Sequence, residues 1–98
     1  MSFRKLQIAE LLRRNISIVL QADGHYIYGP EAMVTVTSVN VTPDLALAKV
    51  YLSIFNSENK QAVLLELEAA IDDVKKNLYY GIRKHVRNVP GFVFYCVD

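Results

Sequence analysis

The spacing of apolar and polar positions divides the first third of the chain into a helix and a loop. Over residues 3–20, apolar side chains recur every three or four positions, which is typical of an amphipathic helix. The residues that follow, 21–31 (QADGHYIYGPE), include two glycines and one proline and predict a loop. The apolar side of the helix consists of Ile8, Leu11, Leu12, Ile16 and Val19.

The stretch Met33–Thr42 is rich in β-branched residues and predicts a strand whose alternation changes phase. The valines at positions 34 and 36 share one parity, and those at 39 and 41 share the other, so a regular strand would put the two pairs on opposite faces. Either both faces are partly covered, or one extra residue near Thr37 or Ser38 forms a bulge that resets the phase. We favour the bulge.

A second strand is predicted over Leu45–Phe55, after a turn at Pro43-Asp44. So short a turn implies antiparallel pairing with the first strand. One face of this strand is apolar and includes small residues that let helices pack closely, whereas the other is half exposed. The apolar face consists of Ala46, Ala48, Val50, Leu52 and Ile54.

The rest of the chain predicts two helices and a last strand. Asn56 or Ser57 caps a helix over 58–71, and Asp72-Asp73 begins another that runs to about Arg87 or Asn88. The segment FVFYCV predicts a buried strand. The fold is therefore α+β, a single domain over residues 1–98 in the order α-β-β-α-α-β, with a three-stranded mixed sheet covered on one face by helices. The buried stripe of the last helix consists of Ile71, Val74, Leu78, Ile82 and Val86.

Composition narrows the class of protein. The chain has 98 residues, of which 52% are hydrophobic, enough to fill a modest core. No apolar run reaches the roughly 18 residues of a membrane span, and the first ten residues lack a signal-peptide core. We therefore expect a cytoplasmic protein with no membrane partner. The single Cys96 cannot form an internal disulfide, and its apolar strand predicts an inert core thiol.

No pattern in the sequence predicts catalysis. His25 and His85 have no second ligand at metal spacing, and the two carboxylates of Asp72-Asp73 point apart on a helix. The sequence contains neither G-x-x-x-x-G-K-[ST] nor G-x-G-x-x-G, the two glycine-rich motifs that bind phosphate groups. We expect no catalytic residues, no metal, no cofactor and no small-molecule substrate.

Charge is informative through its distribution, because the net charge is only +1. In the last helix, five residues fall at i, i+4, i+7, i+8 and i+11, which places them on one side, opposite the buried stripe. Four cations over about three turns can follow phosphates, and a tyrosine ring can stack on an unpaired base. The alternative is a solvated helix face, but such faces usually mix signs and this one has no acid. The five residues are Lys76, Tyr80, Arg83, Lys84 and Arg87.

Other candidates are less specific. Arg13 and Arg14 lie near Glu10, so a solvated face accounts for them at least as well as RNA does. Lys49 shares the open face of its strand with Tyr51, and the pair either meets RNA or forms a half-buried tyrosine beside a lysine whose stem lies along apolar surface. Gly81 predicts close packing between helices.

Three segments carry a resemblance to a known family. The stretch VTVTSVNVTPDLALAKVYLSIFN (Val34–Asn56) resembles the central signature of the ribosome-binding factor A family. RKLQIAELLRRNISIVLQ (Arg4–Gln21) is similar to the first helix of that family, and NLYYGIRKHVRNVPGFVFY (Asn77–Tyr95) is similar to its last helix and strand. The order of elements is that of the type II KH domain.

The resemblance implies a non-catalytic bacterial assembly factor that binds the free small (30S) ribosomal subunit and its rRNA. It implies support of late maturation and 5′-end processing of that rRNA, including growth in the cold. We expect a monomer. The alternative is a KH-like module that docks an acidic protein partner. The RNA contacts that the resemblance implies are Arg13, Arg14, Lys49, Lys76, Arg83, Lys84 and Arg87.

The sequence departs from the family pattern at the junction between the paired helices. KH domains usually clamp RNA there with Gly-x-x-Gly, and the family has Ala-x-Gly, whereas this chain reads Ala69-Ala70-Ile71-Asp72-Asp73. The segment Gly24–Glu31 also lacks the Asp-Pro-Arg of many members, and members usually continue beyond the position of Asp98.

Overall fold

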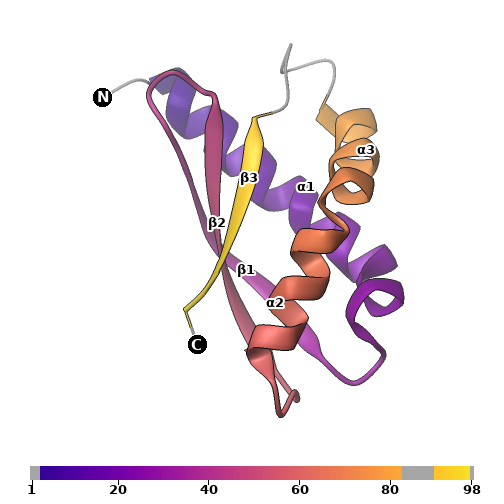
Figure 1. Cartoon of the computed structure of the whole chain (residues 1–98). Helices are drawn as coiled ribbons and strands as arrows, with labels where there is room; N and C mark the ends of the chain where they lie inside the picture. Colours follow the sequence, from indigo (N-terminus) through magenta and orange to yellow (C-terminus); the bar gives the residue numbers. More distant parts are fainter. Residues whose placement is uncertain (1–2, 83–89, 98) are drawn as a thin grey trace.

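The structure is a computed structural model that describes residues 3–82 and 90–97. The element order is α-β-β-α-α-β, as the sequence predicts (Figure 1). The elements are α1 (Phe3–Tyr28), β1 (Met33–Val41), β2 (Leu47–Phe55), α2 (Lys60–Ala69), α3 (Ile71–Ile82) and β3 (Gly91–Cys96).

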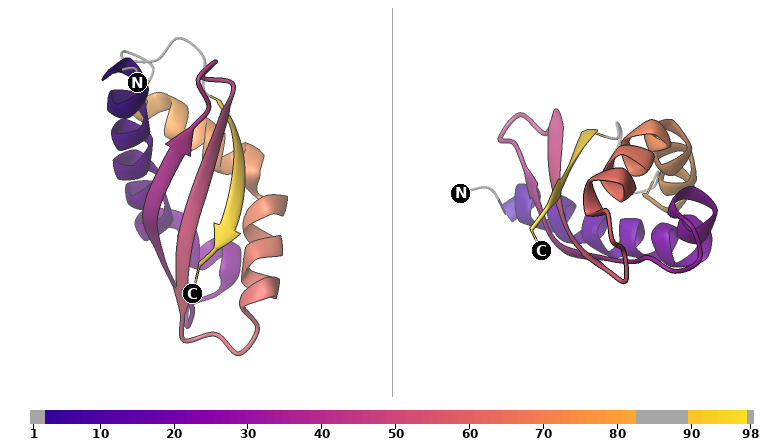
Figure 2. Two further views of the ribbon diagram at one scale, coloured as in Figure 1. Left: turned by 90° about the vertical axis from the view of Figure 1, so that its left-hand side faces the viewer. Right: turned by 60° about the horizontal axis from the view of Figure 1, so that its bottom comes forward.

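The three strands form one mixed sheet in the order β1-β2-β3. β1 pairs with β2 antiparallel, whereas β3 pairs with β2 in parallel, because two helices intervene between them in sequence. The left view of Figure 2 shows the sheet in front and the helices behind it, so one face is covered and the other is open. This confirms the predicted fold class.

The core lies between the covered face of the sheet and the helices. Ala48, Val50, Leu52 and Ile54 of the central strand are completely buried, and Phe92 and Phe94 of β3 extend the same layer. α1 packs on β1, α2 packs on β2 and β3, and α3 packs mainly against α1. The prediction for Ala46 is wrong, since this residue is exposed and precedes β2, which begins at Leu47. The buried helix residues are Ile8, Leu12, Ile16, Leu20, Val63, Leu67, Val74, Leu78 and Ile82.

The predicted bulge in β1 is present at Thr37. Val36 pairs with Leu52 and Ser38 with Tyr51, so Thr37 is the extra residue between two paired positions. Thr37 and Ser38 are both exposed, and the valines on either side of them share the covered face. The Thr37 hydroxyl donates a hydrogen bond to the Tyr51 carbonyl at 3.0 Å. β1 ends at Val41 rather than Thr42.

The hairpin turn is held by its polar side chains. The Leu45 amide donates to the Thr42 carbonyl at 2.8 Å. Asp44 accepts from the Thr42 hydroxyl at 2.7 Å and from the Ala46 amide at 3.1 Å. These bonds favour the ionised carboxylate, so the Thr42 hydroxyl first and the Ala46 amide second lower the pKa of Asp44.

α1 continues to Tyr28, so the predicted end at residue 20 is wrong, and the predicted loop over 21–31 is confirmed only for residues 29–31. Gly24 costs helix propensity, but Ile27 and Tyr28 pack against the core and compensate for it. A Cβ at Gly24 would overlap the Tyr28 hydroxyl, so glycine makes room for this ring. The stop signal is Gly29, which has φ +95° and donates to the His25 carbonyl at 3.0 Å. Burial raises the pKa of Tyr28.

α2 begins at Lys60, capped by Asn59 rather than by the predicted Asn56 or Ser57. The Asn59 carboxamide oxygen accepts from the Ala62 amide at 3.1 Å. Asn56 is instead in the left-handed region, with φ 57°, so it turns the chain away from β2 before the cap is reached.

A single residue separates α2 from α3. Ala70 has φ −96° and ψ 12°, which ends α2, and its amide donates to the Glu66 and Leu67 carbonyls at 3.1 and 3.2 Å. Its carbonyl accepts from the Val74 amide at 3.0 Å and so begins α3. The bend between the helices therefore forms without glycine. Asp72 and Asp73 lie in the first turn of α3, as predicted.

The last strand alternates rather than being buried throughout. Phe92 and Phe94 face the core, whereas Tyr95 is exposed. The strand ends at Cys96, so Val97 lies beyond it and is exposed. Cys96 packs against the edge of the core and is only partly buried, so the predicted core position of this thiol is wrong. The predicted end of the last helix near Arg87 and its buried Val86 lie outside the described residues.

Candidate nucleic-acid interface

α1 and α3 approach each other closely at Gly81. A Cβ at this position would lie 2.6 Å from the Asn15 carboxamide oxygen, so a larger residue would require the Asn15 side chain to move. Asn15 is fixed in turn by donating to the Leu11 carbonyl at 2.8 Å. This confirms that Gly81 marks close helix packing. We call this region the α1–α3 contact.

The α1–α3 contact joins two basic segments that are far apart in sequence. Arg14 precedes Asn15 on α1 and Tyr80 precedes Gly81 on α3, and both are exposed. Lys76 lies one turn before Tyr80 and is also exposed. Arg14, Lys76 and Tyr80 are therefore exposed residues of the two helices that meet at this contact.

Arg13 is less available for RNA than Arg14. Its guanidinium forms a salt bridge with Glu10, with 3.1 Å between Arg13 Nε and Glu10 Oε2. The hydrogen bond from Arg13 lowers the pKa of Glu10, and the bond to Glu10 raises the pKa of Arg13. Both side chains lie at the surface, where such a pair contributes little to stability but offsets the charge of Arg13.

Tyr80 is 62% exposed and lies edge-on to Tyr79, with 6.1 Å between ring centroids. Such a ring offers an accessible aromatic surface on the side of α3 that faces away from the core. The other three residues of the predicted basic side of this helix, Arg83, Lys84 and Arg87, lie outside the described residues.

Lys49 does not belong to the same surface. It lies on the open face of β2, on the other side of the sheet from the helices, and is half-buried. It is the only charged residue in the three described strands. Tyr51, two positions further along this face, stacks on Tyr95 of β3 with 5.4 Å between ring centroids and 22° between ring planes. The predicted cations thus divide between two surfaces.

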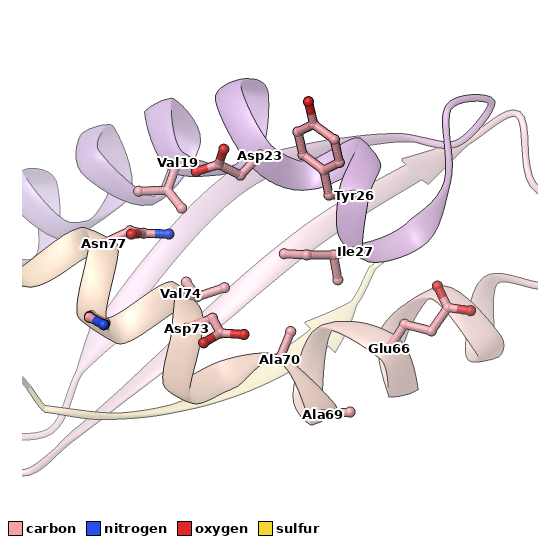
Figure 3. Close-up of a pocket in the computed structure, with 11 residues that line it drawn as sticks. Val19, Asp23, Tyr26, Ile27, Glu66, Ala69, Ala70, Asp73, Val74 and Asn77 are labelled. Carbon is pink, nitrogen blue, oxygen red and sulfur yellow. The ribbon is translucent and has the colours of Figure 1, made fainter.

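A groove of about 780 Å³ lies between the second half of α1 and the α2–α3 bend (Figure 3). We call it the junction groove. Its lining includes three carboxylates but one lysine, so it repels phosphate. The sequence reasoning missed it because residues 21–28 were expected to form a loop; helical spacing continued through Gly24 would have placed Asp23 and Ile27 beside α3. The lining residues are Val19, Asp23, Tyr26, Ile27, Glu66, Ala69, Ala70, Asp73, Val74, Lys76 and Asn77.

The described part of the chain has neither a cluster of metal ligands nor a membrane-spanning helix. Residues 3–82 and 90–97 contain no group of three or more His, Cys, Asp or Glu side chains placed to hold a metal ion. Within the same ranges, no helix is both long enough and apolar enough to cross a membrane.

The fold and its surfaces define a KH-like α+β protein with helices on one face of a mixed sheet. The family model described as ribosome-binding factor A matches residues 4–97. A ribosome-binding factor A from Cytophaga hutchinsonii is 33% identical over 97 residues, covering 99% of this chain and 72% of the relative. The chain belongs to the ribosome-binding factor A family.

Solved structures agree with the fold. The crystal structure of ribosome-binding factor A from Thermus thermophilus aligns with a TM-score of 0.76 at 23% identity, covering 94% of each chain. A homology model of the Thermus thermophilus protein, fitted into a cryo-EM map of a 30S complex, aligns with a TM-score of 0.70 at 24% identity. It covers 89% of this chain and 88% of the other.

Proposed function

We propose that this chain binds the small (30S) ribosomal subunit through small-subunit rRNA, without catalysis, and acts as one RNA-binding domain over residues 1–98. Family membership supports this, as does the similar Thermus thermophilus protein, which has been fitted into a map of a 30S complex. We further propose that it acts in the cytoplasm as a monomer, without cofactor or small-molecule substrate.

The observation that carries the RNA-binding surface is the α1–α3 contact. Gly81 packs against Asn15, and Arg14, Lys76 and Tyr80 are exposed on these two helices, which supports the proposal that the three form one surface. Cations on two packed helices can follow two segments of a phosphate backbone, and the exposed tyrosine can stack on an unpaired base between them. Arg83, Lys84 and Arg87 follow in sequence and are proposed to extend this surface, with Arg13 at its margin.

The test is binding to purified small subunits at several salt concentrations. The double variant Arg14→Gln/Lys76→Gln should bind more weakly and lower the slope of log K against log salt by about 1 to 2, because each phosphate contact contributes roughly 0.7–0.9. A matched control removes two other cations, Lys60 and Lys75, by the same substitution. Equal weakening by the control would show that only net charge matters and would contradict the proposed surface.

Substitutions of Tyr80 distinguish the contribution of base stacking to binding from the contribution of charge. Tyr80→Phe should retain binding, whereas Tyr80→Ala should lose about 1–3 kcal/mol, a factor of roughly 5 to 150, if one base stacks on the ring. Charge reversal at Arg83, Lys84 and Arg87 should abolish binding to small subunits. Unchanged binding by that triple variant would refute the basic side of the last helix.

Protein-free small-subunit rRNA distinguishes RNA binding from docking on an acidic protein. Binding to the naked rRNA with the same salt slope supports the proposal, and binding only to the protein-containing subunit opposes it. Lys49, on the open face of the sheet, is proposed as a second rRNA contact beside the Tyr51–Tyr95 stack. Lys49→Gln should weaken binding additively with Arg14→Gln, because the two lie on opposite sides of the sheet.

We also propose the maturation role. Cells depleted of this protein should accumulate small-subunit rRNA with an unprocessed 5′ end and grow poorly in the cold. The wild-type chain should restore both, and the Arg14→Gln/Lys76→Gln variant should not. Normal 5′ ends after depletion would refute this role while leaving subunit binding to be judged by the binding test.

A further inference from the structure

We propose that the junction groove binds an arginine-rich segment of a protein partner, which goes beyond the proposed rRNA binding. The groove is mainly acidic, whereas the proposed rRNA surface is basic, and Lys76 is common to both. Three helical segments each contribute one carboxylate, from Asp23, Glu66 and Asp73, and Lys76 is the only cation among the described residues that line the groove. A cationic ligand is attracted to such a site, and a phosphate backbone is repelled.

The floor of the groove is apolar. In Figure 3, Ile27 of α1 and Ala70 at the helix bend point toward one another across the groove, and Val74 points from α3 toward α1. Val19 completes this floor from α1. Arginine and lysine have apolar stems beneath their charged heads. An aliphatic floor beneath a rim of carboxylates therefore matches both parts of a basic side chain, which a bare acidic cluster does not.

An aromatic ring stands at the edge of the groove. Tyr26 belongs to the groove lining and is 81% exposed, so nearly all of its ring is available to a ligand. Its neighbour His25 lies 4.2 Å from it, measured between ring centroids. A guanidinium placed over a tyrosine ring gains a cation–π interaction and can still donate to a carboxylate. Arginine uses both contacts through its planar group, so we favour arginine over lysine.

The groove is the size of a site for a short segment. Its volume of about 780 Å³ falls within the roughly 300–1,000 Å³ of sites that bind small ligands. It has room for a few side chains of an extended peptide. The site lies at the α2–α3 bend, where the KH resemblance would place an RNA clamp. The charge of its lining instead assigns that bend to a basic protein segment.

The test uses a fluorescein-labelled nonapeptide of alternating arginine and glycine. A second peptide carries citrulline in place of arginine, which keeps the shape and removes the charge. The arginine peptide should bind, the citrulline peptide should bind at least tenfold more weakly, and amide resonances of Val19, Ile27 and Val74 should shift in a ¹⁵N-labelled sample. Equal binding of the two peptides, or shifts elsewhere only, would overturn the proposal.

Matched variants separate the groove from overall acidity. Asp23→Asn/Asp73→Asn removes two groove carboxylates, and Glu68→Gln/Asp72→Asn removes two exposed carboxylates that do not line it. Both change the net charge equally. The groove variant should weaken the arginine peptide at least tenfold, and the control less than threefold. Equal losses would refute the site, provided that circular dichroism shows both variants folded; Glu66→Gln alone serves if the double variant unfolds.

An oligouridylate competitor decides between protein and RNA. It should not displace the peptide, and it should not shift the groove resonances. Displacement would mean that RNA occupies the groove and would overturn the proposal. Because these variants leave Arg14 and Tyr80 intact, binding to naked rRNA should persist when peptide binding is lost, so failure of the groove and failure of the rRNA surface are distinguishable.

Discussion

The bulge at Thr37 predicts that one residue can be deleted from the middle of β1 without disturbing the core. Val36 already pairs with Leu52, and Ser38 already pairs with Tyr51, so removing Thr37 joins two correctly placed positions and leaves a regular strand. Every valine of β1 keeps the covered face. The loss is confined to the hydrogen bond from the Thr37 hydroxyl to the Tyr51 carbonyl, about 1 kcal/mol.

Deletion of Asn40 provides the matched comparison. If the residues after the deletion, toward the hairpin turn, shift by one position, Val41 moves to the open face. Val41 is 1% exposed in the native fold. If the other side shifts and absorbs the bulge, Val39 leaves the covered face and the Ser38 hydroxyl enters it. Either way the fold loses about 1.5–3 kcal/mol for one valine, with a further cost for the disturbed turn or the buried hydroxyl.

Thermal unfolding followed by circular dichroism measures the difference. At about 4–8 °C per kcal/mol for a chain of this size, the Thr37 deletion should lower Tm by about 4–8 °C and the Asn40 deletion by about 12 °C or more. Thr37→Ala should lower Tm by as much as the Thr37 deletion does, because both changes remove the same hydrogen bond. If the two deletions cost the same, Thr37 does not set the phase of β1.

Three further predictions concern the ends of two helices and the hairpin turn. Gly29→Ala should destabilise by about 1–2 kcal/mol in urea unfolding, because φ +95° is strained for a side chain even in open space; Gly91→Ala, where a Cβ meets nothing closer than 3.7 Å, should cost less than half as much. Asn59→Ala should lower Tm by about 4–8 °C through loss of the cap, and Asn59→Ser should retain most of it; equal Tm values for the two would argue against capping. The pKa of Asp44 is lowered in the folded state, so its contribution to stability is present above its unfolded pKa and is lost as pH falls through its folded pKa. Asp44→Asn should therefore lose less stability than the wild type between pH 5 and pH 2, and parallel acid-unfolding curves would contradict this.

The fold could be predicted where a pattern was repeated along an element. The phase change between two pairs of valines located the bulge, and alternation in β2 identified its buried face. Helix ends were harder, because each depends on contacts distant in sequence. Gly24 resembles a stop signal, yet the ring of Tyr28 occupies the space that its missing side chain leaves. Asn56 resembles a cap, yet its left-handed backbone moves the true cap to Asn59.

The candidate sites were likewise predictable where they followed from a local pattern, and not where they depended on contacts distant in sequence. Exposure of Lys76 and Tyr80 followed from helical spacing alone. That Lys49 lies on the other side of the sheet follows only from how the helices and sheet pack, and so does the proposal that Arg14 joins Lys76 and Tyr80. The junction groove needed the correct end of α1, since Asp23 faces α3 only if the helix continues past residue 20. The sequence shows the carboxylates that line the groove, but it does not show that they lie close together in the fold.

β3 follows in sequence every helix and strand that it packs against, and this order has a consequence for how the protein is made. Phe92 and Phe94 emerge from the ribosome after every helix and strand they pack against, and β3 pairs with β2 across a long stretch of sequence. The β1–β2 hairpin can form during synthesis. The packing of β3 beside β2 and beneath α2 cannot form until β3 itself has emerged. We expect nascent chains to stay incompletely packed and exposed to proteases until β3 is released, so that changes in β3 reduce yield before they alter the finished protein.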